Sequence, residues 1–355
     1  MTHSHSSKLV NGLKMTFITE NNTHPLLQPL YIGGLEIQNR LMVAPMAGVT
    51  DNPFRRLCKS FGAGHAVSEM MTADATLYAH KKSLFRANFE GEIAPISAQI
   101  AGADVDKIAE AAQYQVNNGA QIIDINMGCP AKKVCRKLAG SALLKDEELV
   151  ARLLDATVAA VDAPVTLKTR LGYENGQENI LRVAKRAEEA GIAAIAIHGR
   201  TREDKYGGKA RYDLIREVKE MVNIPVIANG DIDSPEKAIE VYEQTGCDAI
   251  MIGRAAQGQP WLFRDIAHYL QTGERLPEPT IDELREIVLT HLEELYAFYG
   301  EYSGCRISRK HIAWYTSGIE DSNAFRQAMY SEETTAGQYK VVDKFLSSQK
   351  LREGA

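Results

Sequence analysis

Short apolar segments alternate with helix-like segments along most of this chain, and this alternation limits its possible folds more than any other feature. The apolar segments, several of them rich in the β-branched residues that favour strands, are residues 41–45, 65–69, 96–100, 122–126, 165–168, 194–197, 225–229 and 249–252. Apolar residues at helical spacing cover residues 104–118, 146–161, 179–190, 212–221 and 234–245. Strands that alternate with helices pair in parallel through right-handed crossovers. Eight such units within roughly 230 residues predict an α/β fold, the TIM (β/α)8 barrel.

The alternative is an open, doubly wound parallel sheet of the kind that binds dinucleotides. That fold carries a G-x-G-x-x-G fingerprint directly after a strand. The candidate Gly62-Ala-Gly64 lacks the third glycine, so we favour the barrel. Helix-end signals agree with the expected helices: Ser234 before Pro235 at a start, and Gly119 and Gly191 at ends.

The strand pattern stops after residue 262. A linker covers residues 272–280, and Thr280 with Glu283 forms a capping box that opens an amphipathic helix. Residues 307–315 and 338–346 also have helical spacing. We therefore expect three parts: a leader or expression scar at residues 1–28, the barrel at 29–262, and a small helical bundle at 263–355.

The composition is that of an ordinary globular protein, with 45% hydrophobic and 25% charged residues. No apolar run approaches the roughly 20 residues of a membrane span, and no signal peptide is visible. The five cysteines show neither a disulfide framework nor a metal-binding spacing, so a reduced, cytoplasmic protein without a metal is expected. The net charge is −5, so any contact with nucleic acid must use local basic patches.

The active site of a TIM barrel lies at the carboxyl ends of its strands. Reading those ends gives one set of candidate residues: Pro45, Met46, Ala47, Gln99, Asn126, Cys129, Lys168, Arg170, His198, Arg200, Asn229, Gly230, Asp231, Gly253 and Arg254.

Cys129 stands at one of these strand ends, between a glycine and a proline. Four basic residues follow it at once, and they indicate an anionic substrate: Lys132, Lys133, Arg136 and Lys137. A protonated thiol here could act as an acid. The alternative is a buried structural cysteine before a turn.

The loops after the seventh and eighth strands each begin with a glycine, Gly230 and Gly253, and Arg254 adds a bidentate partner for phosphate. The phosphate could belong to a substrate or to flavin mononucleotide (FMN). Gln99 and Lys168 favour the flavin, because an amide matches the edge of the ring and a cation stabilises its reduced form. A Schiff-base lysine of an aldolase is the alternative for Lys168, and a structural histidine is the alternative for His198.

Several motifs together resemble the tRNA-dihydrouridine synthase family, with greatest similarity to its bacterial B-type branch. The resemblance runs from about residue 30 to the C-terminal helices. It rests on the segments APMAGVTD at 44–51, DINMGCPAKKV at 124–134, IHGRT at 197–201, IANGD at 227–231 and IGRAAQG at 252–258, and on the tail at 304–315. Cys135 departs from the polar residue that the branch would place there.

The resemblance implies reduction of uridine to 5,6-dihydrouridine in the D-loop of tRNA. A hydride would pass from NADPH through N5 of FMN to C6, and Cys129 would donate the proton to C5. Asn126 would hold the uracil. The flavin would be lined by Pro45, Met46, Ala47, Gln99, Lys168, His198, Asn229, Gly230, Asp231, Gly253 and Arg254.

For tRNA we expect contacts from Lys132, Arg136, Arg170 and Arg200 at the barrel, and from Arg306, Arg309 and Lys310 in the helical part. These last three can share one helix face; the alternative is an ordinary solvated face. A monomer is expected. Two other functions stay open: a flavoprotein reductase of free pyrimidines or dihydroorotate, and an RNA-binding protein that has lost activity. The sequence does not decide which uridine is modified, whether NADPH or NADH is used, or whether Cys135 contributes.

Overall fold

The computed structural model describes residues 24–353, and they divide into two compact units. One unit holds the described residues up to Ala256 together with Trp261–Glu274, and the other holds Gln257–Pro260 and the residues from Arg275 onward. None of the described helices is both long and apolar enough to cross a membrane.

The first unit is a TIM barrel, as predicted. In its described residues the barrel strands run parallel in chain order: β3 (Leu41–Val43), β4 (His65–Ala66), β6 (Ser97–Ala101), β7 (Ile122–Met127), β8 (Val165–Arg170), β9 (Ala194–His198), β10 (Val226–Asn229) and β11 (Ala249–Ile252). β11 pairs with β3, and a parallel bridge between Val67 and Ser97 joins the β4 end to β6, which closes the ring. The short β5 (Met71–Thr72) also pairs with β6.

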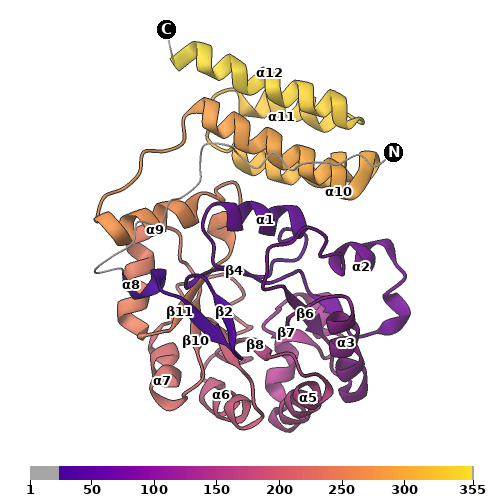
Figure 1. The fold of residues 1–355 in the computed structure, drawn as a ribbon, viewed down its shortest axis with the longest axis vertical. Helices are drawn as coiled ribbons and strands as arrows, with labels where there is room; N and C mark the ends of the chain where they lie inside the picture. Colours follow the sequence, from indigo (N-terminus) through magenta and orange to yellow (C-terminus); the bar gives the residue numbers. More distant parts are fainter. Residues whose placement is uncertain (1–23, 354–355) are drawn as a thin grey trace. The chain divides into compact units, whose positions relative to one another are not determined.

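Helices surround the strands (Figure 1). The predicted helices are confirmed within a residue or two: α3 (Val105–Asn117), α5 (Glu147–Ala160), α6 (Ile180–Glu189), α7 (Asp213–Met221) and α8 (Pro235–Thr245). Ser234 caps α8 as expected, because its side chain accepts a hydrogen bond from the Lys237 N–H. The remaining helices of this unit are α1 (Asn52–Ser60), α2 (Lys81–Arg86), α4 (Lys132–Cys135) and α9 (Leu262–Thr272), with short 3-10 turns η1 (Pro25–Leu27), η2 (Ala75–Leu77), η3 (Gly140–Lys145) and η4 (Arg254–Ala256).

A short antiparallel hairpin precedes the barrel, and the sequence prediction missed it. β1 (Leu30–Ile32) and β2 (Leu35–Ile37) flank Gly33 and Gly34, a glycine pair that is itself a hairpin signal. Ile32 and Ile37 share one buried cluster with Ile122, Ala194 and Ala249, which begin three of the barrel strands. The hairpin therefore fills the amino end of the barrel and leaves the carboxyl end for the site.

Two predicted boundaries change. The leader expected at 1–28 lies largely outside the described residues, but η1 falls within it and buries Leu26 and Leu27. Helix α9 belongs with the barrel unit, so the main part of the second unit begins at residue 275, not at 263.

The second unit is a helical bundle. Its described helices are α10 (Ile281–Tyr315), α11 (Ser322–Ser331) and α12 (Thr335–Glu353), and α12 packs on both others. The predicted capping box of Thr280 and Glu283 is present at the start of α10. Gly300 interrupts the helical backbone of α10 with φ 75°, a value that glycine tolerates. α11 was not predicted, because it buries few apolar side chains.

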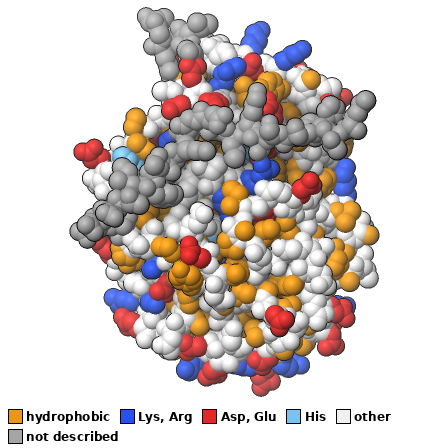
Figure 2. Space-filling model, in the orientation of Figure 1, with side chains coloured by type: hydrophobic (Ala, Val, Ile, Leu, Met, Phe, Trp, Pro, Cys, Tyr) orange, Lys and Arg blue, Asp and Glu red, His pale blue; other side chains and the backbone are white. Residues whose placement is uncertain are grey.

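Charges of both signs are intermixed on the face drawn in Figure 2, most visibly along its lower edge, where α5, α6 and α7 lie in Figure 1. Several charged residues of these helices are paired, as Arg182 is with Glu147 and Arg216 with Glu220. Such a surface has no general attraction for a polyanion.

Candidate active site at the barrel mouth

Cys129 lies just beyond β7, and side chains that hydrogen-bond to its backbone hold it in place. The Cys129 N–H donates to Asn126 Oδ1 (3.0 Å), and the Ser141 hydroxyl donates to the Cys129 carbonyl oxygen (2.9 Å). The Cys135 Sγ lies 3.6 Å from that same oxygen. Partial burial raises the pKa of the Cys129 thiol, so it stays protonated at neutral pH. A protonated thiol in a fixed loop is a group that can donate a proton.

A line of buried polar side chains leads from the barrel interior to this loop. Asp124 Oδ2 accepts from Gln99 Nε2 (2.7 Å), and Gln99 Oε1 accepts from Asn126 Nδ2 (2.8 Å). Because a carboxylate only accepts, it turns the nitrogen of Gln99 toward itself and the oxygen toward Asn126. Asp124 thereby orients two amides of the site. Burial raises the pKa of Asp124 to about 6, against hydrogen bonds from Thr166 and Gln99.

Lys168 projects from β8 and is almost fully buried. Its Nζ donates to Asn229 Oδ1 (2.8 Å), and Asn229 Nδ2 donates to the Met251 carbonyl oxygen (2.7 Å). Burial and the nearby Arg170 lower the pKa of Lys168 to about 7, while Asp124 opposes that shift. The site therefore holds an ammonium group whose charge depends strongly on its surroundings.

The glycine-bearing loop after β10 carries a partly buried ion pair. Asp231 accepts from Arg200 through both carboxylate oxygens (2.9 and 2.7 Å) and from Arg254 (3.2 Å). Gly230 is required here, because its φ is 126° and a Cβ would lie 2.9 Å from the Ala210 Cβ. Burial opposes ionisation of Asp231, but the hydrogen bonds from Arg200 and the Ala210 N–H prevail and lower its pKa.

The two arginines predicted at the ends of β8 and β9 are 2% exposed. Arg170 donates to the carbonyl oxygens of Gly128 (2.7 Å) and Thr201 (2.9 Å), so it braces the Cys129 loop. Arg200 donates to Gly207 and Gly208 in addition to Asp231. Both side chains thus support the mouth, and their contact with tRNA stays a prediction.

The other predicted residues also come together at the mouth. Pro45, Met46 and Ala47 follow β3, and Met46 Sδ would lie 3.8 Å from a Cβ placed on Gly253. His198 ends β9, and its pKa is strongly lowered by burial and then by Arg170, so the ring is neutral.

Sequence reasoning missed two residues of this site. Asp124 stands inside an apolar strand, and a carboxylate in that setting was the available signal. Tyr206 lies in the loop between β9 and α7, with its side chain 52% exposed. The Arg170 and Arg254 guanidinium carbons lie 5.4 and 5.0 Å from its ring centroid. Tyr206 lies too far beyond the end of β9 for the spacing of residues in the sequence to predict its place at the site.

Beside the thiol, the four predicted cations of α4 and its end are all exposed: Lys132, Lys133, Arg136 and Lys137. Within the described part of the chain none of them forms an ion pair. We call them the α4 cations. Unpaired positive charge next to the mouth suits a phosphate backbone.

The cations predicted in the helical unit are more varied. Arg306 is exposed and lies over the Tyr302 ring, 5.3 Å from its centroid. Arg309 Nη2 donates to the Glu332 carbonyl oxygen (2.9 Å) at the end of α11, so this arginine helps to hold the bundle together. Lys310 is partly exposed.

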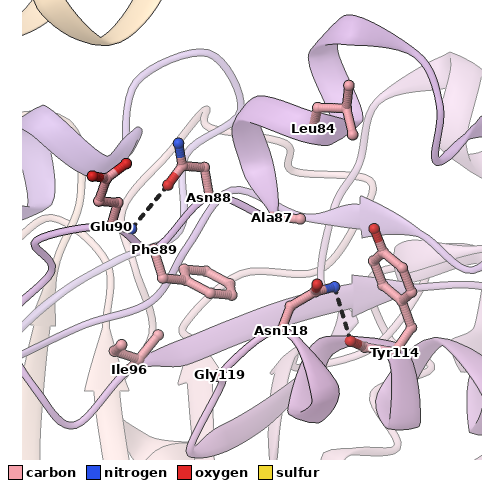
Figure 3. A pocket seen from close by; sticks show the side chains of 9 residues that line it. All are labelled: Leu84, Ala87, Asn88, Phe89, Glu90, Ile96, Tyr114, Asn118 and Gly119. Carbon is pink, nitrogen blue, oxygen red and sulfur yellow. Dashed lines mark hydrogen bonds between the residues drawn. The ribbon is translucent and has the colours of Figure 1, made fainter.

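A pocket of about 530 Å³ lies elsewhere on the barrel unit (Figure 3). Ile96 in its wall precedes β6, so this pocket is near the amino ends of the strands, away from the mouth. It contains none of the predicted site residues; its lining is Leu84, Ala87, Asn88, Phe89, Glu90, Ile96, Tyr114, Asn118 and Gly119. Among the described residues, no group of three or more His, Cys, Asp or Glu side chains could hold a metal ion.

With this geometry established, comparison with known proteins identifies the family. The sequence model described as dihydrouridine synthase (Dus) matches residues 42–350. The chain belongs to the dihydrouridine synthase family. It is similar to proteins named tRNA-dihydrouridine synthase B: 57% identical to that of Pseudomonas aeruginosa over 89% of this chain and 95% of that protein, and 53% identical to that of Vibrio vulnificus over 89% and 98%.

Solved structures with a similar fold are far more distant in sequence. A 2-naphthoyl-CoA reductase complex aligns with a TM-score of 0.54 and 14% identity, over 69% of this chain and 52% of that one. The histamine dehydrogenase from Rhizobium sp. 4-9 aligns with a TM-score of 0.51 and 14% identity, over 76% and 51%. The chain thus spans about half of each, and the likeness concerns the fold.

Proposed function

We propose that this protein reduces uridine to 5,6-dihydrouridine in tRNA, with FMN as resident cofactor and NADPH as electron donor. The observation that carries the proposal is the Cys129 thiol, protonated and fixed beyond β7, on the same mouth as the buried Lys168 and the amides of Gln99 and Asn126. Membership of the dihydrouridine synthase family and the similarity to proteins named tRNA-dihydrouridine synthase B support it.

The residues at the mouth fit a flavin. Lys168 is a buried cation able to stabilise negative charge on a reduced ring, and Gln99 has amide groups for its polar edge. Gly230 and Gly253 leave the backbone accessible beside Arg254. Arg254 pairs with Asp231, and its guanidinium can also bind a phosphate. When bound, FMN supplies the electron pair that saturates the C5–C6 bond of uracil.

Cys129 supplies the proton in this proposal. The raised pKa keeps hydrogen on Sγ, and the thiol gives it to C5, leaving a thiolate that solvent reprotonates. Asn126 uses Oδ1 for the loop N–H groups and one Nδ2 hydrogen for Gln99, which leaves a second Nδ2 hydrogen for a uracil carbonyl. The hydrogen bonds that run from Asp124 through Gln99 to Asn126, here called the Asp124 relay, hold that donor in place.

An internal uridine must leave its stack to reach the barrel mouth. The α4 cations can bind the phosphates that flank it, and Arg306 with Lys310 can bind tRNA from the helical unit. Free-pyrimidine reduction is the competing function, and it gives no role to the unpaired α4 cations. We place the reaction in the cytoplasm and expect a monomer.

The test uses the purified full chain. It should be yellow and release FMN on denaturation, and with NADPH it should form dihydrouridine in a tRNA transcript, measured by mass spectrometry of nucleosides. Free uridine and dihydroorotate should give no comparable turnover. Turnover of the free pyrimidine with an unchanged tRNA would replace this proposal with the competing one, and NADH in a parallel assay decides the donor.

A further inference from the structure

Leu138 is an exposed apolar residue in an unfavourable backbone conformation. It lies between α4 and η3, and its side chain is 68% exposed, more than any other large aliphatic side chain of the described residues. Its φ is +57°, in the left-handed region that residues other than glycine seldom adopt. Both properties occur at one position.

Folding energetics do not account for a leucine at this position. The left-handed conformation costs free energy that glycine would avoid. A buried leucine could offset that cost by the hydrophobic effect, but this side chain remains in water. A single exposed leucine is ordinary on a protein surface; one that also carries backbone strain indicates a function.

The surroundings of Leu138 connect it to the reaction site. Its N–H donates to the Cys135 carbonyl oxygen (3.0 Å), and it directly follows the α4 cations. Two residues later, Gly140 packs so closely on the thiol loop that a Cβ there would lie 2.8 Å from the Cys129 carbonyl oxygen. The leucine is thus held in the segment that joins the positive charge to the thiol.

We propose that Leu138 is an apolar wedge that occupies the space left in the tRNA when the target uridine leaves its stack. This inference rests on the proposed reduction of uridine in tRNA. Removing one base exposes the apolar faces of its neighbours, and apolar side chains are known to insert at such steps. The α4 cations would hold the flanking phosphates, and Leu138 would pack on the uncovered base, which favours the extruded state of the uridine.

The experiment compares Leu138→Ala, Leu138→Gly and Leu138→Met. The Ala and Gly variants should show a roughly 10- to 100-fold lower kcat/KM for folded tRNA, because the wedge would no longer offset part of an unstacking cost of about a few kcal/mol. The Met variant should keep most of the activity, because it retains an apolar side chain of similar reach. The melting temperature of the Gly variant should not fall, because relief of strain offsets the added freedom of its unfolded chain.

Two further measurements separate a wedge from a support of the loop. FMN reduction by NADPH and the rate at which iodoacetamide alkylates Cys129 should match the wild type in all three variants. Leu84→Ala, which truncates another exposed leucine (53% exposed), is the matched control and should leave tRNA turnover unchanged.

Wild-type turnover of tRNA by the Ala and Gly variants would overturn the inference. So would a loss that is accompanied by altered Cys129 alkylation, because Leu138 would then act through the loop. Absence of dihydrouridine with the wild-type protein would instead overturn the proposed function.

Discussion

At the scale of single residues, the two thiols of the mouth are distinguished by what holds them. The Cys129 backbone is fixed by Asn126, whereas the Cys135 thiol contacts the Cys129 carbonyl oxygen and the Ser141 hydroxyl. We expect Cys129→Ala to retain FMN and NADPH oxidation but to lose about 10²–10⁴-fold in uridine reduction, the usual contribution of a general acid. Cys135→Ala is the control and should stay within a few-fold of wild type. If the two results were exchanged, the acid would be Cys135.

The buried pair of Asp124 and Lys168 predicts a pH dependence. The folded-state pKa of Lys168 is lowered to about 7, so its positive charge is present below that pH and is lost as the pH rises through it. Flavin reduction by NADPH should therefore decline above about pH 7. In Asp124→Asn the decline should begin at lower pH, because the carboxylate that favours the ammonium form is gone.

Stopped-flow measurement of flavin reduction between pH 5 and 9 (roughly the range in which this lysine titrates) checks this. Lys168→Arg should flatten the profile, because a guanidinium stays charged throughout. Asp248→Asn is the matched control: it removes a carboxylate that binds Lys219 at the amino end of β11. An identical profile in wild type and Asp124→Asn would show that Asp124 does not set the charge of Lys168.

At the scale of elements, the α4 cations are expected to contribute to tRNA binding. Replacing all four α4 cations by Gln should raise KM for tRNA and reduce the slope of log K against log salt by about 0.7–0.9 for each phosphate that the variant no longer neutralises. Flavin content and NADPH oxidation should be unchanged, because none of the four side chains supports the strand ends.

The control removes charge where it is already paired. Lys185→Gln and Arg216→Gln change exposed cations that face Glu188 and Glu220, and they should leave the salt slope as it is. An unaltered slope in the α4 variant would move the RNA contact of the barrel to another surface.

The eight barrel strands and the five helices α3, α5, α6, α7 and α8 were predictable, because each strand is a short apolar run and each of these helices repeats its apolar residues at 3.6-residue spacing. That the strand ends lie together was predictable, because closed parallel barrels place them at one mouth. The Asp124 relay and the Tyr206 contacts were not, since both depend on partners distant in sequence. Burial of Arg200 also escaped prediction: its partner Asp231 is 31 residues away.

At the scale of the whole molecule, the residues proposed to contact the substrate are divided between two compact units. The barrel holds the strand-end residues and the α4 cations, while the helical unit contains Arg306 and Lys310. A substrate as large as tRNA can contact both units at once, and each phosphate contact releases counterions independently. The two sets of cations should then make separate contributions to one salt slope.

Arg306→Gln with Lys310→Gln tests this directly. Arg309 is kept, because its hydrogen bond to Glu332 supports the bundle and its removal would confuse folding with binding. The double variant should weaken tRNA binding and lower the salt slope by roughly 0.7–0.9 for each phosphate released, with no change in NADPH oxidation. Combined with the α4 substitutions, the decreases in binding free energy should add within about 0.5 kcal/mol, as they do for independent sites. Filter-binding titrations over a range of salt concentrations measure both the salt slope and the binding free energy. If the double variant has the same salt slope as the wild type, the helical unit does not bind the tRNA backbone through these residues.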